Sequence, residues 1–218
     1  MTTTVKICGM KTEETIEAAL ASGASLIGFI FFEKSPRNVT PEEAGRLRRG
    51  IGDRASVVAV TVNADDAVLD RIVDEVNPDY LQLHGGETPD RVRQVRARYG
   101  LPVIKVFSIR DAADIEAIRA WRGVADRFLL DAKAPAGSEL PGGNGVSFDW
   151  SLLRALDGDV DYMLSGGLNA GNVSAALEIT GAMAIDVSSG VESAPGVKDS
   201  ALISRFFEKV AAVSQPVA

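Results

Sequence analysis

The stretch SVVAVTVNADDAVLDRIVDEVNPDYLQLH, residues 56–84, sets the pattern on which the predicted fold depends. It begins with an apolar run, Ser56–Val62, continues with an amphipathic segment, Asp65–Val76, and ends with a second short run, Tyr80–His84. Apolar residues at consecutive positions indicate a strand covered on both faces, because a strand with one solvated face would alternate. The stretch therefore predicts one strand–helix–strand unit of a parallel sheet.

The same alternation of short apolar runs and amphipathic segments continues through the chain. The runs predicted as strands are Val5–Gly9, Leu26–Phe32, Ser56–Val62, Tyr80–His84, Val103–Ser108, Arg127–Ala132, Tyr162–Ser165 and Ala184–Ser188. The segments predicted as helices are Lys11–Ser22, Pro41–Arg49, Asp65–Val76, Pro89–Arg98, Ala112–Trp121, Asp149–Leu156, Ala170–Ile179 and Asp199–Val213. Thr40-Pro41 and Thr88-Pro89 are typical helix starts.

Eight such units predict an α/β protein with one (β/α)8 TIM barrel, because right-handed crossovers add parallel strands until the sheet meets itself. We expect a single domain over residues 1–218, a length that one barrel fills. A doubly wound open sheet would also alternate strands and helices. It is disfavoured because no G-x-G-x-x-G follows the first strand.

Composition limits the classes of partner. The chain has 218 residues, 46% of them hydrophobic, and a formal net charge of -7. This balance argues against general binding to nucleic acid or anionic lipid. Its single cysteine excludes an intrachain disulfide and a multi-cysteine zinc site, and we expect neither metal nor cofactor. Without a leader or an apolar run near the roughly 18 residues of a membrane span, we expect a cytoplasmic protein with no membrane partner.

Glycine-rich turns follow the last strands and predict a phosphate site. Loops after strands seven and eight of barrels often bind phosphate through backbone N–H groups. Each turn alone would more often be only a tight turn, but two lie at adjacent strand ends, and a third glycine cluster follows strand six. We expect a sugar-phosphate ligand held by Gly143, Gly145, Gly166, Gly167, Ser188, Ser189 and Gly190.

Polar residues at the carboxyl ends of apolar strands are expected to face the barrel mouth. They are Cys8, His84, Asp131 and Asp186, with Arg37 on the loop after strand two. A lone cysteine is more often a buried hydrophobe, but Cys8 lies opposite Asp131, so thiol and carboxyl can flank one substrate. The thiol would act as a base with its pKa slightly lowered, and the carboxyl as an acid with its pKa raised by burial. Arg37 suits bidentate capture of a carboxylate.

Other readings of these residues stay open. Asp131 equally suits an ion pair with Lys133 or Lys105, or a cap for the following loop. For His84 a structural or substrate-contacting role is favoured over catalysis. Lys11 as a Schiff-base catalyst is discounted because it begins a helix, whereas Lys105 lies in a strand and suits either an internal ion pair or a covalent role.

Taken together, the motifs resemble those of the phosphoribosylanthranilate isomerase family, and they run in order along almost the whole chain. They are Lys6-Ile7-Cys8-Gly9, Ser35-Pro36-Arg37, Leu81-Gln82-Leu83-His84-Gly85, Leu130-Asp131, Phe148-Asp149-Trp150, Gly166-Gly167-Leu168 and Asp186-Val187-Ser188-Ser189-Gly190-Val191-Glu192. The resemblance implies a barrel of the ribulose-phosphate-binding type and an intramolecular oxidoreductase (aldose–ketose isomerase) of tryptophan biosynthesis. It also implies a cofactor-free Amadori rearrangement of N-(5-phosphoribosyl)anthranilate to 1-(2-carboxyphenylamino)-1-deoxyribulose 5-phosphate.

The resemblance also implies roles for single residues. Asp131 would protonate the furanose ring oxygen, and Cys8 would remove the proton from the sugar C2. Arg37 would bind the anthranilate carboxylate, and Asp186 would lie near the ribose hydroxyls. One position departs from the family pattern, since Asn144 replaces a common Thr and the stretch before it, Ala134–Leu140, looks extended.

Two alternative functions remain. The first is the related aminoimidazole-ribonucleotide isomerase of histidine biosynthesis, or a dual-substrate version, which resembles this barrel but has Asp as its base where this chain has Cys8. The second is a non-catalytic sugar-phosphate-binding barrel, which the presence of both Cys8 and Asp131 disfavours. In each case the partner is a small sugar phosphate, and the chain is expected to act as a monomer or a homodimer.

Overall fold

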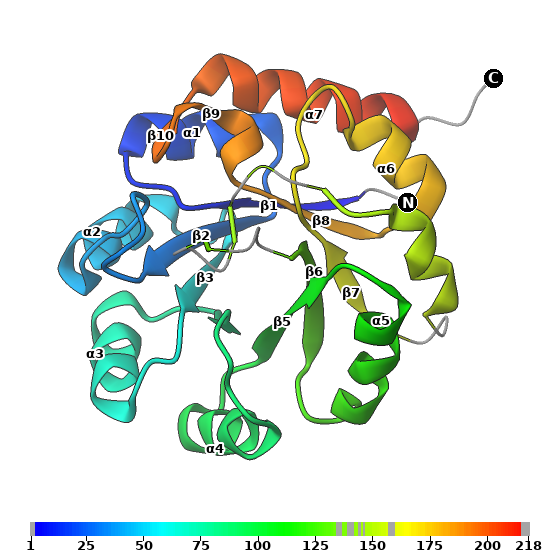
Figure 1. Cartoon of the computed structure of the whole chain (residues 1–218). Helices are drawn as coiled ribbons and strands as arrows, with labels where there is room; N and C mark the ends of the chain where they lie inside the picture. The colour runs from blue at the N-terminus through cyan, green and yellow to red at the C-terminus, as the bar shows by residue number, and fades with distance from the viewer. Residues whose placement is uncertain are drawn as a thin grey trace.

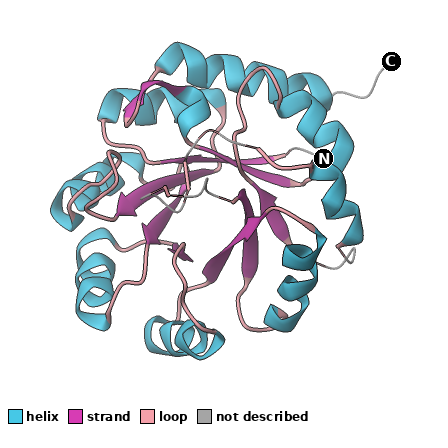
Figure 2. Ribbon diagram, in the orientation of Figure 1, coloured by secondary structure: helices cyan, strands magenta, loops and turns pink. Residues whose placement is uncertain are grey.

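The computed structural model describes residues 3–133, 137–138, 142–143, 145, 147–156 and 160–214. In this part of the chain eight parallel strands close into a barrel in the order β1 to β8, and helices surround it (Figure 1, Figure 2). The strands are β1 (Thr4–Cys8), β2 (Leu26–Phe31), β3 (Ser56–Thr61), β4 (Tyr80–Leu83), β5 (Val103–Ile109), β6 (Arg127–Ala132), β7 (Tyr162–Leu164) and β8 (Ala184–Val187).

Closure of the sheet confirms the predicted (β/α)8 barrel and excludes the open sheet. The first strand pairs with β2 on one side, where Cys8 lies opposite Gly28, and with β8 on the other, where Lys6 lies opposite Asp186. Every predicted strand end lies within one residue of the observed one. The agreement follows from burial on both faces, which makes each strand apolar at consecutive positions.

The helices predicted to start at Thr40-Pro41 and Thr88-Pro89 begin at Pro41 and Pro89, whereas the one predicted from Ala170 begins at Val173. Seven α-helices of the described residues lie outside the barrel. They are α1 (Glu13–Ser22), α2 (Pro41–Ile51), α3 (Asp66–Val76), α4 (Pro89–Tyr99), α5 (Ala112–Ile118), α6 (Val173–Thr180) and α7 (Ser200–Ser214). At α2, the Thr40 side chain accepts from Glu43 N and the Glu43 side chain accepts from Thr40 N, which satisfies two free backbone donors. At α4, Thr88 accepts from Arg91 N in the same manner.

Two segments predicted as α-helices contain 3-10 helices. Between β6 and β7, the predicted helix Asp149–Leu156 is the 3-10 helix η2 (Trp150–Ala155). The predicted helix Ala112–Trp121 is divided into α5 and a final 3-10 turn, η1 (Arg119–Trp121). The Asp149 side chain accepts from Ser151 N at 2.9 Å, a local bond that favours a tight turn. Periodicity in so short a segment does not separate the two helix types.

A hairpin after β8 was not predicted. A third 3-10 helix, η3 (Ser189–Val191), leads into β9 (Glu192–Ala194), which pairs antiparallel with β10 (Val197–Lys198). These strands are too short to show a pattern. In the turn between them, a Cβ on Gly196 would lie 2.4 Å from the carbonyl oxygen of Pro36, so the hairpin packs directly against the loop after β2.

Side chains fill the inside of the barrel. The apolar ones are Cys8, Leu26, Val58, Val60, Ile104, Val106, Leu129, Met163 and Ala184. Two polar side chains, Lys6 and Gln82, are fully buried on strands β1 and β4. A packed interior limits the chemistry to the mouth, as in other barrels. No helix in the described residues is long and apolar enough to cross a membrane.

Candidate active site

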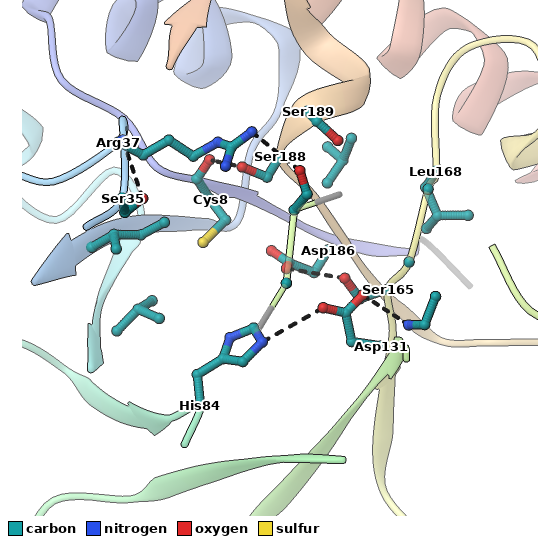
Figure 3. Close-up of a pocket in the computed structure, with 18 of the residues that line it drawn as sticks. Cys8, Ser35, Arg37, His84, Asp131, Ser165, Leu168, Asp186, Ser188 and Ser189 are labelled. Carbon is teal, nitrogen blue, oxygen red and sulfur yellow. Dashed lines mark hydrogen bonds and ion pairs between the residues drawn. The ribbon is translucent and has the colours of Figure 1, made fainter. Parts of the chain in front are cut away.

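A pocket lies at the carboxyl ends of the strands and brings together most of the residues predicted to act (Figure 3). Ten of the twelve predicted residues line it: Cys8, Arg37, His84, Asp131, Gly143, Gly166, Gly167, Asp186, Ser188 and Ser189. Gly145 and Gly190 do not line it. Gly190 instead packs below the mouth, where a Cβ would lie 1.8 Å from the carbonyl oxygen of Leu168.

Cys8 ends β1 with its sulfur turned toward the pocket (Figure 3). It is only 5% exposed. Burial raises the pKa of the Cys8 thiol, while the nearby ammonium groups of Lys6 and Lys198 act in the opposite direction. The expected lowering of the thiol pKa is therefore wrong, because removing the thiolate from water outweighs the attraction of the two cations.

Asp131 is the next-to-last residue of β6 and lies beside His84. Its Oδ2 lies 3.5 Å from His84 Nε2, and its Oδ1 accepts from Ala132 N at 2.9 Å. On the other side of the ring, Gln82 Nε2 lies 3.3 Å from His84 Nδ1. With the Gln82 amide nitrogen as donor, Nδ1 accepts and the ring proton lies on Nε2, which faces the carboxyl of Asp131 but has no hydrogen-bond partner among the described residues. The three side chains form a chain from the barrel interior to the mouth.

The alternative partners of Asp131 lie elsewhere. Lys105 Nζ donates to Glu87 Oε2 at 2.8 Å, and both side chains are buried. Lys133 Nζ lies 4.0 Å from Asp114 Oδ1. Among the described residues, neither lysine forms an ion pair with Asp131. Lys105 Nζ also donates to carbonyl oxygens of the loop after β4, so the internal ion pair expected for it fixes the loop that follows His84.

Arg37 reaches the pocket from the loop after β2. Its Nε and Nη2 donate to Glu192 Oε1 and Oε2, both at 2.8 Å, and Lys198 Nζ approaches the same carboxylate at 2.5 Å. Burial by itself raises the pKa of the Glu192 carboxyl, but Arg37 and Lys198 together hold it below its usual value. A buried cation–anion–cation cluster thus fixes the direction of the Arg37 guanidinium.

Asp186 lies deeper than the other mouth residues. Its Oδ1 accepts from Lys6 Nζ at 2.8 Å, and Ser165 Oγ lies 3.4 Å from its Oδ2 (Figure 3). Lys6 is 0% exposed and Asp186 is 5% exposed. One oxygen of the carboxylate therefore stays on the pocket side, where a substrate hydroxyl can reach it.

The turns after β7 and β8 have conformations that require small residues. Gly166 and Gly167 have φ values of 91° and 63°, and a Cβ on Gly166 would lie 2.6 Å from Ala132 N. Asn172 Nδ2 donates to the carbonyl oxygen of Gly167 at 2.9 Å and fixes the turn before α6. Ser188 Oγ donates to the carbonyl oxygen of Cys8 at 3.0 Å, which ties the last strand to the first. The turns bring backbone groups to the pocket without bulky side chains.

Two described glycines after β6 lie against Asp131, His84 and Arg37. A Cβ on Gly142 would lie 2.6 Å from Asp131 Oδ2 and 2.7 Å from His84 Nε2, and one on Gly143 would lie 2.7 Å from Arg37 Nη1. Both glycines line the pocket. Asn144 and most of the stretch 134–140 lie outside the described residues.

Sequence reasoning missed several buried residues of the site: Lys6, Gln82, Ser165, Glu192 and Lys198. A signal existed for Lys6, because a lysine inside an apolar strand must find a buried partner.

Lys11, discounted as a catalyst, is exposed and donates to the carbonyl oxygen of Pro36. In the described part of the chain, no group of three or more His, Cys, Asp or Glu side chains is placed to hold a metal ion.

Comparison with known proteins gives consistent matches along the chain. The family profile described as N-(5'phosphoribosyl)anthranilate (PRA) isomerase matches residues 5–209. A curated N-(5'-phosphoribosyl)anthranilate isomerase of Brucella canis is 65% identical over 215 residues, which cover 98% of this chain and 97% of the relative.

Solved structures agree in fold over the same length. A phosphoribosyl anthranilate isomerase from Thermotoga maritima is 35% identical with a TM-score of 0.87, covering 97% of this chain and 100% of that one. A second structure of such an enzyme, in complex with reduced 1-(o-carboxyphenylamino)-1-deoxyribulose 5-phosphate, is 33% identical with a TM-score of 0.84 and the same coverage.

Proposed function

The chain belongs to the N-(5'-phosphoribosyl)anthranilate isomerase family, and from that premise we propose that Cys8 is the general base and Asp131 the general acid of its reaction. The enzyme is an isomerase of tryptophan biosynthesis that acts on a sugar-phosphate substrate. The observation that carries the assignment is the single pocket lined by both side chains, one from β1 and one from β6.

The protein's part in the proposed steps is proton transfer. Asp131 donates a proton to the furanose ring oxygen, and the lone pair of the anthranilate nitrogen forms the C1=N bond of a protonated Schiff base as the C1–O bond breaks. Cys8 then takes the proton from C2, the electron pair of that C–H bond forms the C1=C2 bond of the enolamine, and the C1=N pair returns to nitrogen. The enolamine tautomerises to the ketone as the C2 hydroxyl loses its proton and C1 gains one. Acid–base steps of this kind each contribute about a hundredfold or more to the rate.

The two ends of the substrate are proposed to bind on opposite sides of the reacting carbons. Arg37, fixed by Glu192, would hold the anthranilate carboxylate in a charge-assisted bond. Asp186 Oδ2, which accepts from Ser165 Oγ at 3.4 Å, would also accept from a ribose hydroxyl. The phosphate would bind backbone N–H groups of the turns after β7 and β8 at the residues that line the pocket, namely Gly166, Gly167, Ser188 and Ser189, whereas Gly190, expected there as well, packs against the carbonyl oxygen of Leu168. Gly143 and Gly145 are less suited to it, since Gly143 packs on Arg37.

The remaining assignments follow from the family. We propose that the whole chain, residues 1–218, forms one domain, that it acts in the cytoplasm, and that it does so as a monomer or a homodimer. The related Thermotoga maritima enzyme is described both as dimeric and as generated monomers. Activity on the aminoimidazole substrate of histidine biosynthesis is disfavoured, because a thiol stands at position 8 in place of the carboxylate of that enzyme.

Two substitutions test the proposal. We expect Cys8→Ala and Asp131→Asn each to lower kcat by about a hundredfold or more while the fold is kept, because each removes one proton-transfer group. Loss of the fluorescence of N-(5-phosphoribosyl)anthranilate measures turnover, and circular dichroism measures the fold. The aminoimidazole substrate, assayed in parallel, distinguishes the two pathways. A folded variant with full activity would reject the role of the residue that it lacks.

A further inference from the structure

Lys6 is a buried cation beneath the pocket that no step of the proposed reaction uses. It lies two residues before Cys8 on β1, so both side chains point into the barrel, since alternate residues of a strand share a face. Lys6 is fully buried, and its Nζ donates to Asp186 Oδ1 at 2.8 Å. Burial of an ion pair costs so much desolvation that stability alone rarely accounts for it. The position of this cation indicates a role in the chemistry.

Gly28 on the neighbouring strand shows how close Lys6 and Cys8 are. Strand register places Gly28 beside Cys8. A Cβ on Gly28 would lie 3.1 Å from Cys8 Sγ and 3.2 Å from Lys6 Cε. The sulfur and the end of the lysine chain therefore border the same small gap, which stays open because residue 28 has no side chain.

Charged and titratable groups face Cys8 from six elements of the site. They are Lys6 on β1, Arg37 on the loop after β2, His84 after β4, Asp131 on β6, Asp186 on β8 and Lys198 on β10. Burial raises the pKa of the Cys8 thiol, and Lys6 opposes this more strongly than Asp186 adds to it. The Lys6–Asp186 pair is neutral as a whole, but it presents its positive end to the sulfur.

We propose that Lys6 is a positioning residue whose ammonium, oriented by Asp186, stabilises the thiolate of Cys8 that takes the C2 proton. This inference rests on the proposed role of Cys8 as the base. Lys6 keeps its own proton throughout, and the substrate proton moves to the sulfur alone. Asp186 provides the counter-charge when the thiol is neutral, so Lys6 stays paired in both states of Cys8.

The test measures the thiol directly. Cys8 is the only cysteine, so the difference in absorbance at 240 nm between each variant and its Cys8→Ala counterpart reports the Cys8 thiolate alone. The variants are Lys6→Met, Asp186→Asn and the double variant with both changes, which leaves no buried charge unpaired. The pH dependence of kcat/KM is measured on the same proteins.

We expect opposite shifts from the two single variants. Lys6→Met should raise the pH at which the thiol ionises by about one unit or more, which gives about tenfold lower kcat/KM at neutral pH and recovery at higher pH. Asp186→Asn should lower that pH, and the double variant should raise it. A purely structural ion pair would instead give shifts of the same sign in both single variants.

Each outcome is decisive for one proposal. A folded Lys6→Met or double variant whose thiol ionises as in the wild type overturns the inference. An upward shift of the thiol ionisation in a folded Asp186→Asn variant, which keeps Lys6, overturns it as well. A thiol shift without a matching shift in the kcat/KM profile leaves the effect of Lys6 on Cys8 standing and overturns Cys8 as the base.

A matched control separates charge from disruption of the barrel. Lys105 and Glu87 form a second buried lysine–carboxylate pair at 2.8 Å, on the side of β5 that faces the helices. The variant Lys105→Met/Glu87→Gln should leave the thiol ionisation of Cys8 unchanged. A shift as large as that of Lys6→Met would show that loosening of the barrel, and not the Lys6 charge, moves the thiol.

Discussion

The guanidinium of Arg37 and the carboxylate of Glu192 form two parallel hydrogen bonds of 2.8 Å, although the residues are 155 positions apart. Glu192 reaches Arg37 because the β9–β10 hairpin packs against the loop after β2, with Gly196 in contact with Pro36. Lys198 completes the cluster from the same hairpin. A guanidinium held in this way has a fixed direction in which to meet a further anion, so with the proposed role of Arg37, Glu192 would act on substrate binding through it.

Glu192→Gln is expected to weaken substrate binding more than it slows the chemistry. A neutral amide loses one charge-assisted bond, so Arg37 becomes free to rotate. We expect KM to rise about tenfold, the equivalent of roughly 1.4 kcal/mol, with a smaller change in kcat. Steady-state kinetics measure both. Glu208→Gln on the exposed face of α7 is the control. A fall in kcat at unchanged KM would contradict a role in binding.

Glu192 should also make stability depend on pH. Burial raises the pKa of its carboxyl, but Arg37 and Lys198 hold the pKa below the ordinary value. A carboxyl whose pKa is lowered by folding stabilises the protein above its unfolded value, about 4.3, and this contribution is lost as pH falls through the folded pKa. Urea unfolding should therefore show the wild type more stable than Glu192→Gln at neutral pH, with the difference shrinking below about pH 4. A difference that stays constant with pH would count against the ion pair.

The barrel and the mouth residues could be predicted because each depends on local sequence. Consecutive apolar residues define β1 or β3 without knowledge of their neighbours, and closure then places Cys8 and Asp131 at one mouth. The pairing of Lys6 with Asp186 could not be predicted in the same way, since it joins residues 180 positions apart through the register of β1 with β8.

Two features of the site depend on three-dimensional burial and have no local signal. The sequence suggests a lowered thiol pKa for Cys8, but desolvation inside the packed barrel raises it. The β9–β10 hairpin has strands of three and two residues, too short for periodicity, so Glu192 and Lys198 were not expected in the site.

Gln82→Leu should disturb the proton position on His84. Gln82 Nε2 lies 3.3 Å from His84 Nδ1 and favours the proton on Nε2, opposite Asp131. Without the amide, both neutral tautomers become accessible, and we expect kcat to fall several-fold because the ring proton no longer faces Asp131 in part of the molecules. His84 is the only histidine in the chain, so nitrogen NMR reads its tautomer without assignment. An unchanged tautomer in the folded variant would show that Gln82 does not set it.

Gly142→Ala should impair catalysis with little effect on stability. A Cβ at this position would lie 2.6 Å from Asp131 Oδ2 and 2.7 Å from His84 Nε2, closer than such atoms can approach, so one of the reacting groups must move. Displacement of a catalytic group by about 1 Å can cost a hundredfold in rate, so we expect kcat to fall by about tenfold to a hundredfold. Gly50→Ala in α2 is the matched control, because its Cβ meets no atom within 4 Å and its backbone is helical. That change should keep activity and stabilise the helix by up to about 1 kcal/mol. If Gly142→Ala keeps full activity, the segment after β6 does not lie over Asp131 and His84 during turnover.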